Sequence, residues 1–185
     1  MPHLNDLPNT LSVRRLCLIA CALAALALAT GWPDPAYAGN HNSGGGGGGP
    51  TPISVSEFRT LEFGSVSSST SGTGTATVSA TGVKSTSGYA INMGGSHRAA
   101  EFRVTGEKNT EVTITLPSSP VTVTNSTGQT ATLHSFSSSP SATATLDNKG
   151  KLTIYVGATL TVPAGANEGD YSGTFIISVI DPLNP

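Results

Sequence analysis

The feature that most constrains this fold is a strict two-residue period in residues 151–162. The odd positions of this stretch are mostly Thr, Lys and Tyr, whereas every even position is apolar: Leu152, Ile154, Val156, Ala158, Leu160 and Val162. Successive side chains of a strand point to opposite faces. The period therefore predicts a long strand with one face in a core and the other in water.

Shorter stretches repeat the alternation, and none has a convincing helical period. Their apolar members are Ala76, Val78 and Ala80; Tyr89, Ile91 and Met93; Phe102 and Val104; Val112, Ile114 and Leu116; Ala131 and Leu133; Ala142, Ala144 and Leu146; and Tyr171, Phe175, Ile177 and Val179. Gly, Pro and Asn punctuate them at the spacing of sandwich strands. The sequence thus predicts an all-β, antiparallel β-sandwich.

The sharpest turn signal is 147–150, Asp-Asn-Lys-Gly. It suits a hairpin turn with Gly150 at a positive φ, joining a strand that ends at Leu146 to one that starts at Lys151. A Ca²⁺ loop is the alternative, but the segment carries too few carboxylates for it.

Residues 1–38 have the three parts of a secretory signal peptide. Arg14 and Arg15 precede an apolar run, residues 16–29, and the small-residue box Ala36-Tyr37-Ala38 follows. This order predicts cleavage between Ala38 and Gly39, with Ala36 and Ala38 as the small residues at the cut. The product is expected in the periplasm, at the cell surface or outside the cell.

Three other interpretations of the leader stay open. The apolar run is short for a retained anchor, since a membrane span needs about 20 residues. Residues 18–21 spell a lipoprotein box, but Cys21 follows Arg15 too closely to leave an apolar region before the cut. The arginine pair resembles a twin-arginine signal without its usual neighbours. We expect general secretion and no stable membrane span after cleavage.

The remainder divides into a linker and one domain. Residues 39–52 contain six consecutive glycines and end in Pro-Thr-Pro, so they predict a flexible linker. Residues 53–185 are expected to form one β-sandwich domain. Both cysteines, Cys17 and Cys21, lie in the leader, so the mature chain has no disulfide or thiolate ligand.

Charge and spacing argue against several functions. After residue 38, seven basic and nine acidic residues are spread singly, which is unlike a nucleic-acid-binding surface. His41, His97 and His134 are not at metal-ligand spacing. Ser96 and His97 are neighbours, which on a strand point opposite ways, and Glu107 and Glu111 flank a turn as solvated charges. We expect no enzyme activity, metal or cofactor; an enzyme would need His97 or His134 bonded to a serine and a carboxylate in a cleft.

Aromatic residues offer the only hint of a ligand. Six are expected in the core: Phe58, Phe63, Phe102, Phe136, Tyr171 and Phe175. Tyr89 and Tyr155 are the two surface candidates for stacking on a glycan, although a structural role is the simpler interpretation of each. The glycosylation pattern at Asn125-Ser126-Thr127 is interpreted as chance.

Five segments taken in order resemble a known family. They are Leu61-Glu62-Phe63-Gly64, Phe102-Arg103-Val104-Thr105-Gly106, Val112-Thr113-Ile114-Thr115-Leu116-Pro117, residues 155–163 (YVGATLTVP) and Gly169-Asp170-Tyr171-Ser172-Gly173-Thr174-Phe175. As a set they are similar to the secreted bacterial family catalogued as a domain of unknown function, DUF4402. The closing Gly-x-Tyr-x-Gly-x-Phe pattern is similar to the last strand of chaperone–usher pilins and of spore-coat-type domains.

That similarity implies an immunoglobulin-like, pilin-like sandwich that lacks a strand. In such pilins a neighbour's N-terminal extension supplies the missing strand. Residues 39–52 hold no apolar side chain that could fill a groove, so this chain would accept a strand without giving one, or would be self-complete. The partner-strand edge is expected along Tyr171, Phe175, Ile177 and Val179, because Pro182 and Pro185 oppose continued pairing.

Two functions therefore remain in view. The first is a non-enzymatic structural or cell-surface protein, pilin-like or adhesin-like, whose partners would be a homo- or hetero-polymeric surface assembly or a chaperone. The second is a periplasmic or extracellular module that binds a glycan or another ligand, with Tyr155 as its leading contact.

Overall fold

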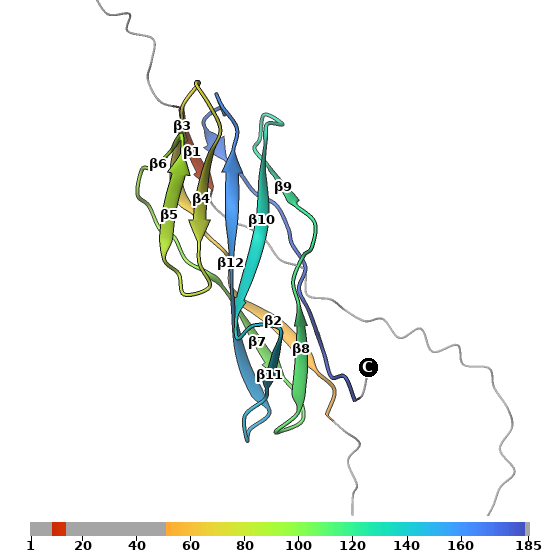
Figure 1. The fold of residues 1–185 in the computed structure, drawn as a ribbon. Coiled ribbons are helices and arrows are strands. Elements are labelled where there is room, and N and C mark those ends of the chain that lie inside the picture. The colour runs from red at the N-terminus through yellow and green to blue at the C-terminus, as the bar shows by residue number, and fades with distance from the viewer. Residues whose placement is uncertain (1–8, 14–50, 184–185) are drawn as a thin grey trace, which may run out of the picture.

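The computed structural model describes residues 9–13 and 51–183. These residues form strands, turns and loops and no helix (Figure 1), so the all-β prediction is confirmed. The predicted cleavage site at Ala36, Ala38 and Gly39 lies outside the described residues, as does the linker up to residue 50.

Fourteen strands occur in this part of the chain. They are β1 (Asn9–Val13), β2 (Ser54–Arg59), β3 (Gly64–Ser68), β4 (Gly74–Val78), β5 (Lys84–Gly88), β6 (Ala90–Asn92), β7 (Ala100–Thr105), β8 (Glu111–Thr115), β9 (Val121–Thr124), β10 (Thr130–Ser139), β11 (Thr143–Thr145), β12 (Lys151–Val162), β13 (Gly169–Asp170) and β14 (Ser178–Ile180).

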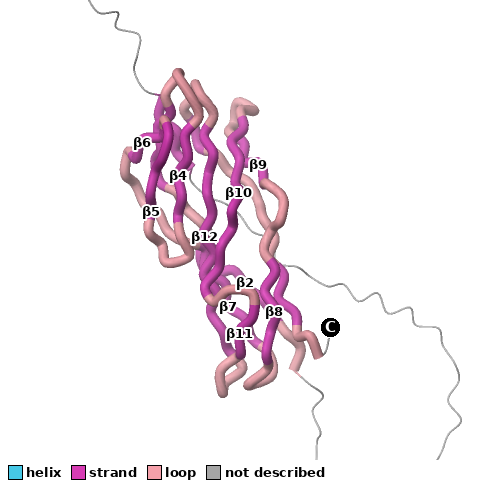
Figure 2. The backbone as a smooth tube through the Cα atoms, in the orientation of Figure 1, coloured by secondary structure: helices cyan, strands magenta, loops and turns pink. Residues whose placement is uncertain are grey.

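The strands form three sheets around one core. The largest runs β2-β7-β12-β10-β9, with β4 also on β12 and β5 on β4. A second runs β13-β1-β3-β6 and a third β11-β8-β14. Every strand pairing of the described chain is antiparallel except that of β1 with β13. Figure 2 shows the sheets curling along the length of the molecule, with β10 and β12 extending furthest.

Strand β12 has the bounds that the two-residue period predicted. Its even positions from Ile154 to Val162 are at most 1% exposed, and Leu152 is partly buried against the same core. One edge pairs with β10. The other pairs first with β7, through residues 151–156, and then with β4, through residues 158–162. One strand thus holds three neighbours in the sheet.

The core is filled by aliphatic and aromatic side chains from all three sheets. Phe175 contacts Phe102 edge-on, with ring centroids 6.3 Å apart, and Phe136, at 5.1 Å. Tyr171 is fully buried, and its hydroxyl donates to the Asn167 carbonyl oxygen at 3.0 Å. Burial raises the pKa of this phenol. A tyrosine bonded to backbone a few residues upstream is a familiar corner device of Greek-key sandwiches.

The predicted turn at Asp147 exists, but it is not a hairpin. Gly150 has φ 69°, and the Asp147 carboxylate accepts hydrogen bonds from the Lys149 and Lys151 amides, which lower the pKa of that carboxyl. However, β11 before the turn pairs with β8, whereas β12 after it pairs with β7 and β10. The turn therefore carries the chain from one sheet to another.

Several expectations about burial were wrong, and Ala142, expected on an apolar face, is exposed. Phe58 was expected in the core but is 47% exposed, because it lies at the end of outer strand β2, where the Arg103 guanidinium covers its ring 3.3 Å from the centroid. Around β6 the expected alternation of burial is absent, because residues 91–98 are all exposed. Ala90 is buried, whereas Ile91 and Met93 are about half exposed.

The contact of Arg103 with Phe58 can be measured as a coupling energy. Unfolding of Arg103→Ala, Phe58→Ala and the double variant should give a favourable coupling of about 0.5–1 kcal/mol, the usual range of an exposed cation–π pair. The matched cycle with Arg59, whose guanidinium lies 5.3 Å from the ring, should give less. A coupling of zero for Arg103, or a larger one for Arg59, would contradict this packing.

Candidate functional sites

A slot between β3 and β13 is the first candidate site. In this slot lies β1, which pairs antiparallel with β3 and parallel with β13 (Figure 1). Its register sets Leu11 opposite Val66 on one side and opposite Gly169 on the other. β3 and β13 do not pair directly with each other, so β1 is what joins them in one sheet. This element was not predicted, because residues 9–13 fall inside the predicted leader.

β3, the strand on one side of the slot, is buried. Val66, Ser67 and Ser68 of β3 are at most 1% exposed, and the Ser67 hydroxyl has no hydrogen-bond partner among the described residues. The Ser68 hydroxyl donates to the Pro163 carbonyl oxygen at 2.7 Å. The Lys84 ammonium donates to the Ser65 carbonyl oxygen, and desolvation lowers the pKa of this lysine. The edge of β3 opposite β1 is paired with β6.

The predicted partner-strand edge lies immediately after this slot. Tyr171, Phe175 and Ile177 are buried in the core, and Val179 is partly buried opposite Ile114 of β8. Their backbone forms little regular strand: Ser172 makes an isolated bridge with Thr124, and β14 begins only at Ser178. Immediately before Tyr171, residues Gly169 and Asp170 form β13, which pairs with β1.

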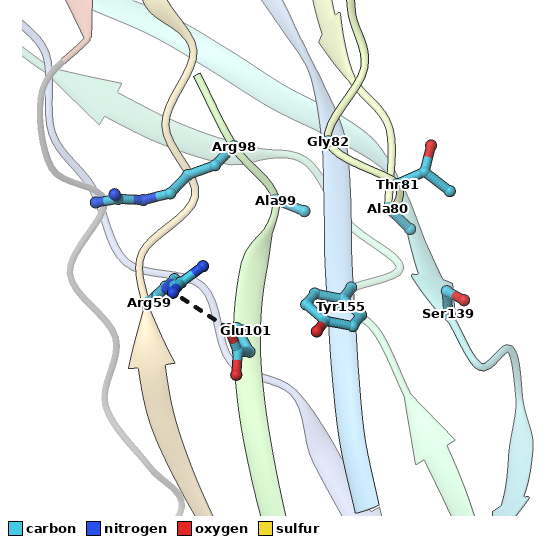
Figure 3. A pocket seen from close by; sticks show the side chains of 9 residues that line it. All are labelled: Arg59, Ala80, Thr81, Gly82, Arg98, Ala99, Glu101, Ser139 and Tyr155. Carbon is cyan, nitrogen blue, oxygen red and sulfur yellow. Dashed lines mark ion pairs between the residues drawn. The ribbon is translucent and has the colours of Figure 1, made fainter. Parts of the chain in front are cut away.

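A surface pocket is the second candidate site. Its floor includes four residues in register across adjacent strands: Arg59 of β2 pairs with Glu101 of β7, Glu101 with Tyr155 of β12, and Tyr155 with Ser139 of β10. Directly opposed residues of antiparallel strands share a face. The register therefore brings four distant segments into one row, and all four line a cavity of about 390 Å³ (Figure 3).

The turn between β4 and β5 forms one wall of this pocket. Ala80, Thr81 and Gly82 line it, beside Tyr155 and Ser139 in Figure 3. This wall exists because β12 exchanges β7 for β4 as its partner at Gly157. A Cβ atom at Gly157 would collide with the backbone of Val78 and Ser79. Glycine is required there for the turn to approach the sheet.

Glu101 is the buried charge of the pocket, with a side chain only 8% exposed. Its carboxylate faces Arg59 Nε at 3.6 Å and Arg103 Nη2 at 3.4 Å. Arg98 also lines the cavity, but its guanidinium bonds Glu62 at 2.6 Å and extends away from Tyr155 (Figure 3). Of the two arginines that line the cavity, Arg59 is therefore the one that contacts Glu101.

The two surface tyrosines are separated by the structure. Tyr155, 42% exposed, lines the pocket, whereas Tyr89, 52% exposed, packs over Gly72 and does not line it. No motif or spacing singles out Arg59, Glu101 or Ser139, because only the strand register brings them to Tyr155.

The remaining sequence-level features have local structural roles. His134 contacts the hydroxyls of Ser135 and Thr161, both at 2.8 Å, and no carboxylate is among its hydrogen-bond partners in the described chain. The Asn125 side chain is bonded inside its own turn, accepting from the Thr127 and Gln129 amides.

The described residues contain neither a cluster of metal-ligating side chains nor a membrane-spanning helix. Within residues 9–13 and 51–183, His, Cys, Asp and Glu do not gather in threes that could hold a metal ion. The same residues include no helix with the length and apolar character of a membrane span.

These features define an all-β protein of antiparallel sheets packed on a single core. Residues 53–180 match the family described as Domain of unknown function (DUF4402), and the chain belongs to that family. The match begins just before β2 and ends with β14, so it takes in the pocket, β3 and β13 but not β1. No curated protein and no solved structure matches the chain.

The close approach at Gly157 gives a direct test of how the pocket is built. Gly157→Ala should lower the free energy of unfolding by about 1–3 kcal/mol, the usual cost of overpacking, because the new methyl group must displace the β4–β5 turn. Thr153→Ala, at an exposed position of the same strand, should change it by less than about 0.5 kcal/mol. Equal effects of the two substitutions in urea unfolding would contradict the described approach.

Proposed function

We propose that the chain is a non-enzymatic, exported structural or cell-surface protein, pilin-like or adhesin-like, that acts by accepting a β-strand from a partner. The observation that carries this proposal is the position of β1. A short segment from outside the family domain occupies the slot between β3 and β13 and pairs with both.

The proposed leader cleavage explains why the slot would be available. Cleavage after Ala38 would remove β1 together with the rest of residues 1–38. β3 would then keep only β6 as a partner, and β13 would have none among the described strands. Unpaired strand edges are templates for another chain, and strand addition satisfies their backbone hydrogen bonds. The processed domain is then an incomplete, immunoglobulin-like sandwich.

The donor is proposed to be a segment of another exported protein, not the linker of a second copy. β1 sets Leu11 opposite Val66 and Val13 opposite Gly64, with Ser12 between them. A donor with the same alternation of apolar and small polar residues fits this register. Residues 39–52 have no apolar alternation, so a copy of this chain supplies no such strand from its linker.

A second candidate function is an extracellular ligand-binding module. It is favoured by one observation: Tyr155, the aromatic residue proposed for glycan stacking, lines the 390 Å³ cavity. Small-molecule sites usually have volumes of about 300–1,000 Å³. This function uses the face of the largest sheet and is compatible with strand acceptance elsewhere on the domain.

Strand acceptance can be tested by supplying β1 as a separate peptide. Protein comprising residues 39–185 should be less stable than the full chain or should self-associate. A peptide containing Asn9–Val13 should raise its Tm by several degrees, since ligand at 100 times its Kd stabilises a native state by about 2.7 kcal/mol. Differential scanning calorimetry with sedimentation analysis measures both effects.

The control peptide carries proline in place of Leu11 and Val13. Proline has no N–H and cannot complete the ladder, so this peptide should leave the Tm unchanged. A stable monomer of residues 39–185 that responds to neither peptide would rule out the slot as the acceptor.

A further inference from the structure

The pocket beside Tyr155 has the chemical make-up of a sugar site. Its row of Arg59, Glu101, Tyr155 and Ser139 combines a cation, a carboxylate, an aromatic ring and a hydroxyl on one sheet face. The β4–β5 turn adds Ala80, Thr81 and Gly82, and Arg98 and Ala99, which precede β7, complete the lining.

Glu101 supplies a fixed hydrogen-bond acceptor. Its carboxylate is buried and is held between Arg59 and Arg103, which lie 3.6 Å and 3.4 Å from its two oxygens. An ionised carboxylate accepts hydrogen bonds only, through two oxygens. Two adjacent hydroxyls of a ligand can donate to such a group in parallel, and the arginines keep the group from rotating away from them.

Arg59 supplies donors on the same side. Its side chain is 56% exposed, and its Nε–Glu101 contact leaves the guanidinium with further N–H groups. A ligand that both donates to Glu101 and accepts from Arg59 needs hydroxyl groups, which do both. Ser139 adds a hydroxyl of the same dual character, whereas the Thr81 hydroxyl is already hydrogen-bonded to Ser79 at 2.8 Å.

The Tyr155 ring provides an apolar surface next to these polar groups. It is 42% exposed and lies beside Glu101 in Figure 3. A pyranose is complementary to this arrangement, because it has hydroxyls around its rim and C–H groups on its faces. The ring and the carboxylate together therefore suit a flat polyhydroxylated ligand better than a purely apolar one.

Charge decides between neutral and acidic sugars. Glu101 would repel a ligand carboxylate, and Arg59 already faces Glu101. Arg98, the other lining arginine, is bonded to Glu62 and directed away from Tyr155. Each arginine of the described lining is thus already in an ion pair with a glutamate, which disfavours a ligand that brings its own carboxylate.

We propose that this pocket binds a neutral pyranose unit of a glycan, with Glu101 accepting from adjacent sugar hydroxyls, Arg59 donating to a sugar oxygen and Tyr155 packing against a C–H face. The inference rests on the second candidate function, ligand binding, and is independent of strand acceptance. Glu101 sets the preference for a neutral sugar over a uronate, and Tyr155 supplies the surface for the C–H face of either.

The test uses the full chain on arrays of neutral and uronate-containing glycans, followed by NMR titration with glucose, galactose, mannose and their uronates. Neutral sugars should bind saturably. Tyr155→Ala and Glu101→Gln should each weaken binding at least about tenfold, while Tyr155→Phe, which keeps the ring, should stay within a few-fold of the unmodified protein. Tyr89→Ala, on the other exposed tyrosine, should bind normally.

Each failure has a distinct meaning. Binding of uronates in preference to neutral sugars would overturn the proposed ligand class but keep a ligand-binding module. Saturable neutral-sugar binding that survives Tyr155→Ala in a folded variant would overturn the pocket assignment. Absence of binding to every glycan and free sugar would overturn both this inference and the second candidate function, leaving strand acceptance untouched. A thermal melt of each variant separates lost binding from lost folding.

Discussion

The constraint on which the rest of the structure depends is the burial of one face of β12 while both of its edges are paired. Its even-numbered side chains enter the core, and its backbone joins β10 on one side and β7 and then β4 on the other. Antiparallel pairing fixes register tightly when one face is buried, because a one-residue slip would turn the apolar set toward water. That register aligns the residues of the pocket across four strands. It also brings the β4–β5 turn so close to Gly157 that no side chain fits there.

The four-stranded sheet, in contrast to the largest one, is held together by β1, a strand from the predicted leader. β3 is buried and held by β6, yet its other edge is paired only by β1. A domain of this size obtains its stability from burial and strand pairing, and the chain beyond the predicted leader contains no cysteine for a disulfide. Under the proposed cleavage this edge of β3 would lose its pairing next to the core, which would lower stability as well as expose a site for a partner strand.

Much of the fold could be predicted from local patterns. The period of residues 151–162 gave the bounds of β12, and Gly150 has its expected positive φ. What failed were inferences that need pairing information. The Asp147 turn joins strands of different sheets, Phe58 ends an outer strand under Arg103, and Ile91 faces outward. Alternation shows that two faces differ, but not which strand lies beside which.

In the candidate sites, too, local patterns predict single residues, whereas strand pairing decides which residues lie together. Tyr155 could be singled out because an aromatic residue at an odd position of β12 must face outward. Its neighbours Arg59, Glu101 and Ser139 are 38 or more positions apart along the chain from one another, and only the ladder brings them together. The partner-strand edge along Tyr171, Phe175, Ile177 and Val179 stays a prediction. The structure buries Tyr171, Phe175 and Ile177 in the core and sets β1 between β3 and β13.

The most direct test of the central claim is amide hydrogen exchange of β3, residues 66–68, in the processed protein with and without a bound donor strand. An edge that accepts a strand should have weakly protected β3 amides when empty and strongly protected ones when filled, while β12 amides stay protected throughout. Equal, strong protection of β3 in both states would show that the sandwich is already complete and would contradict the account.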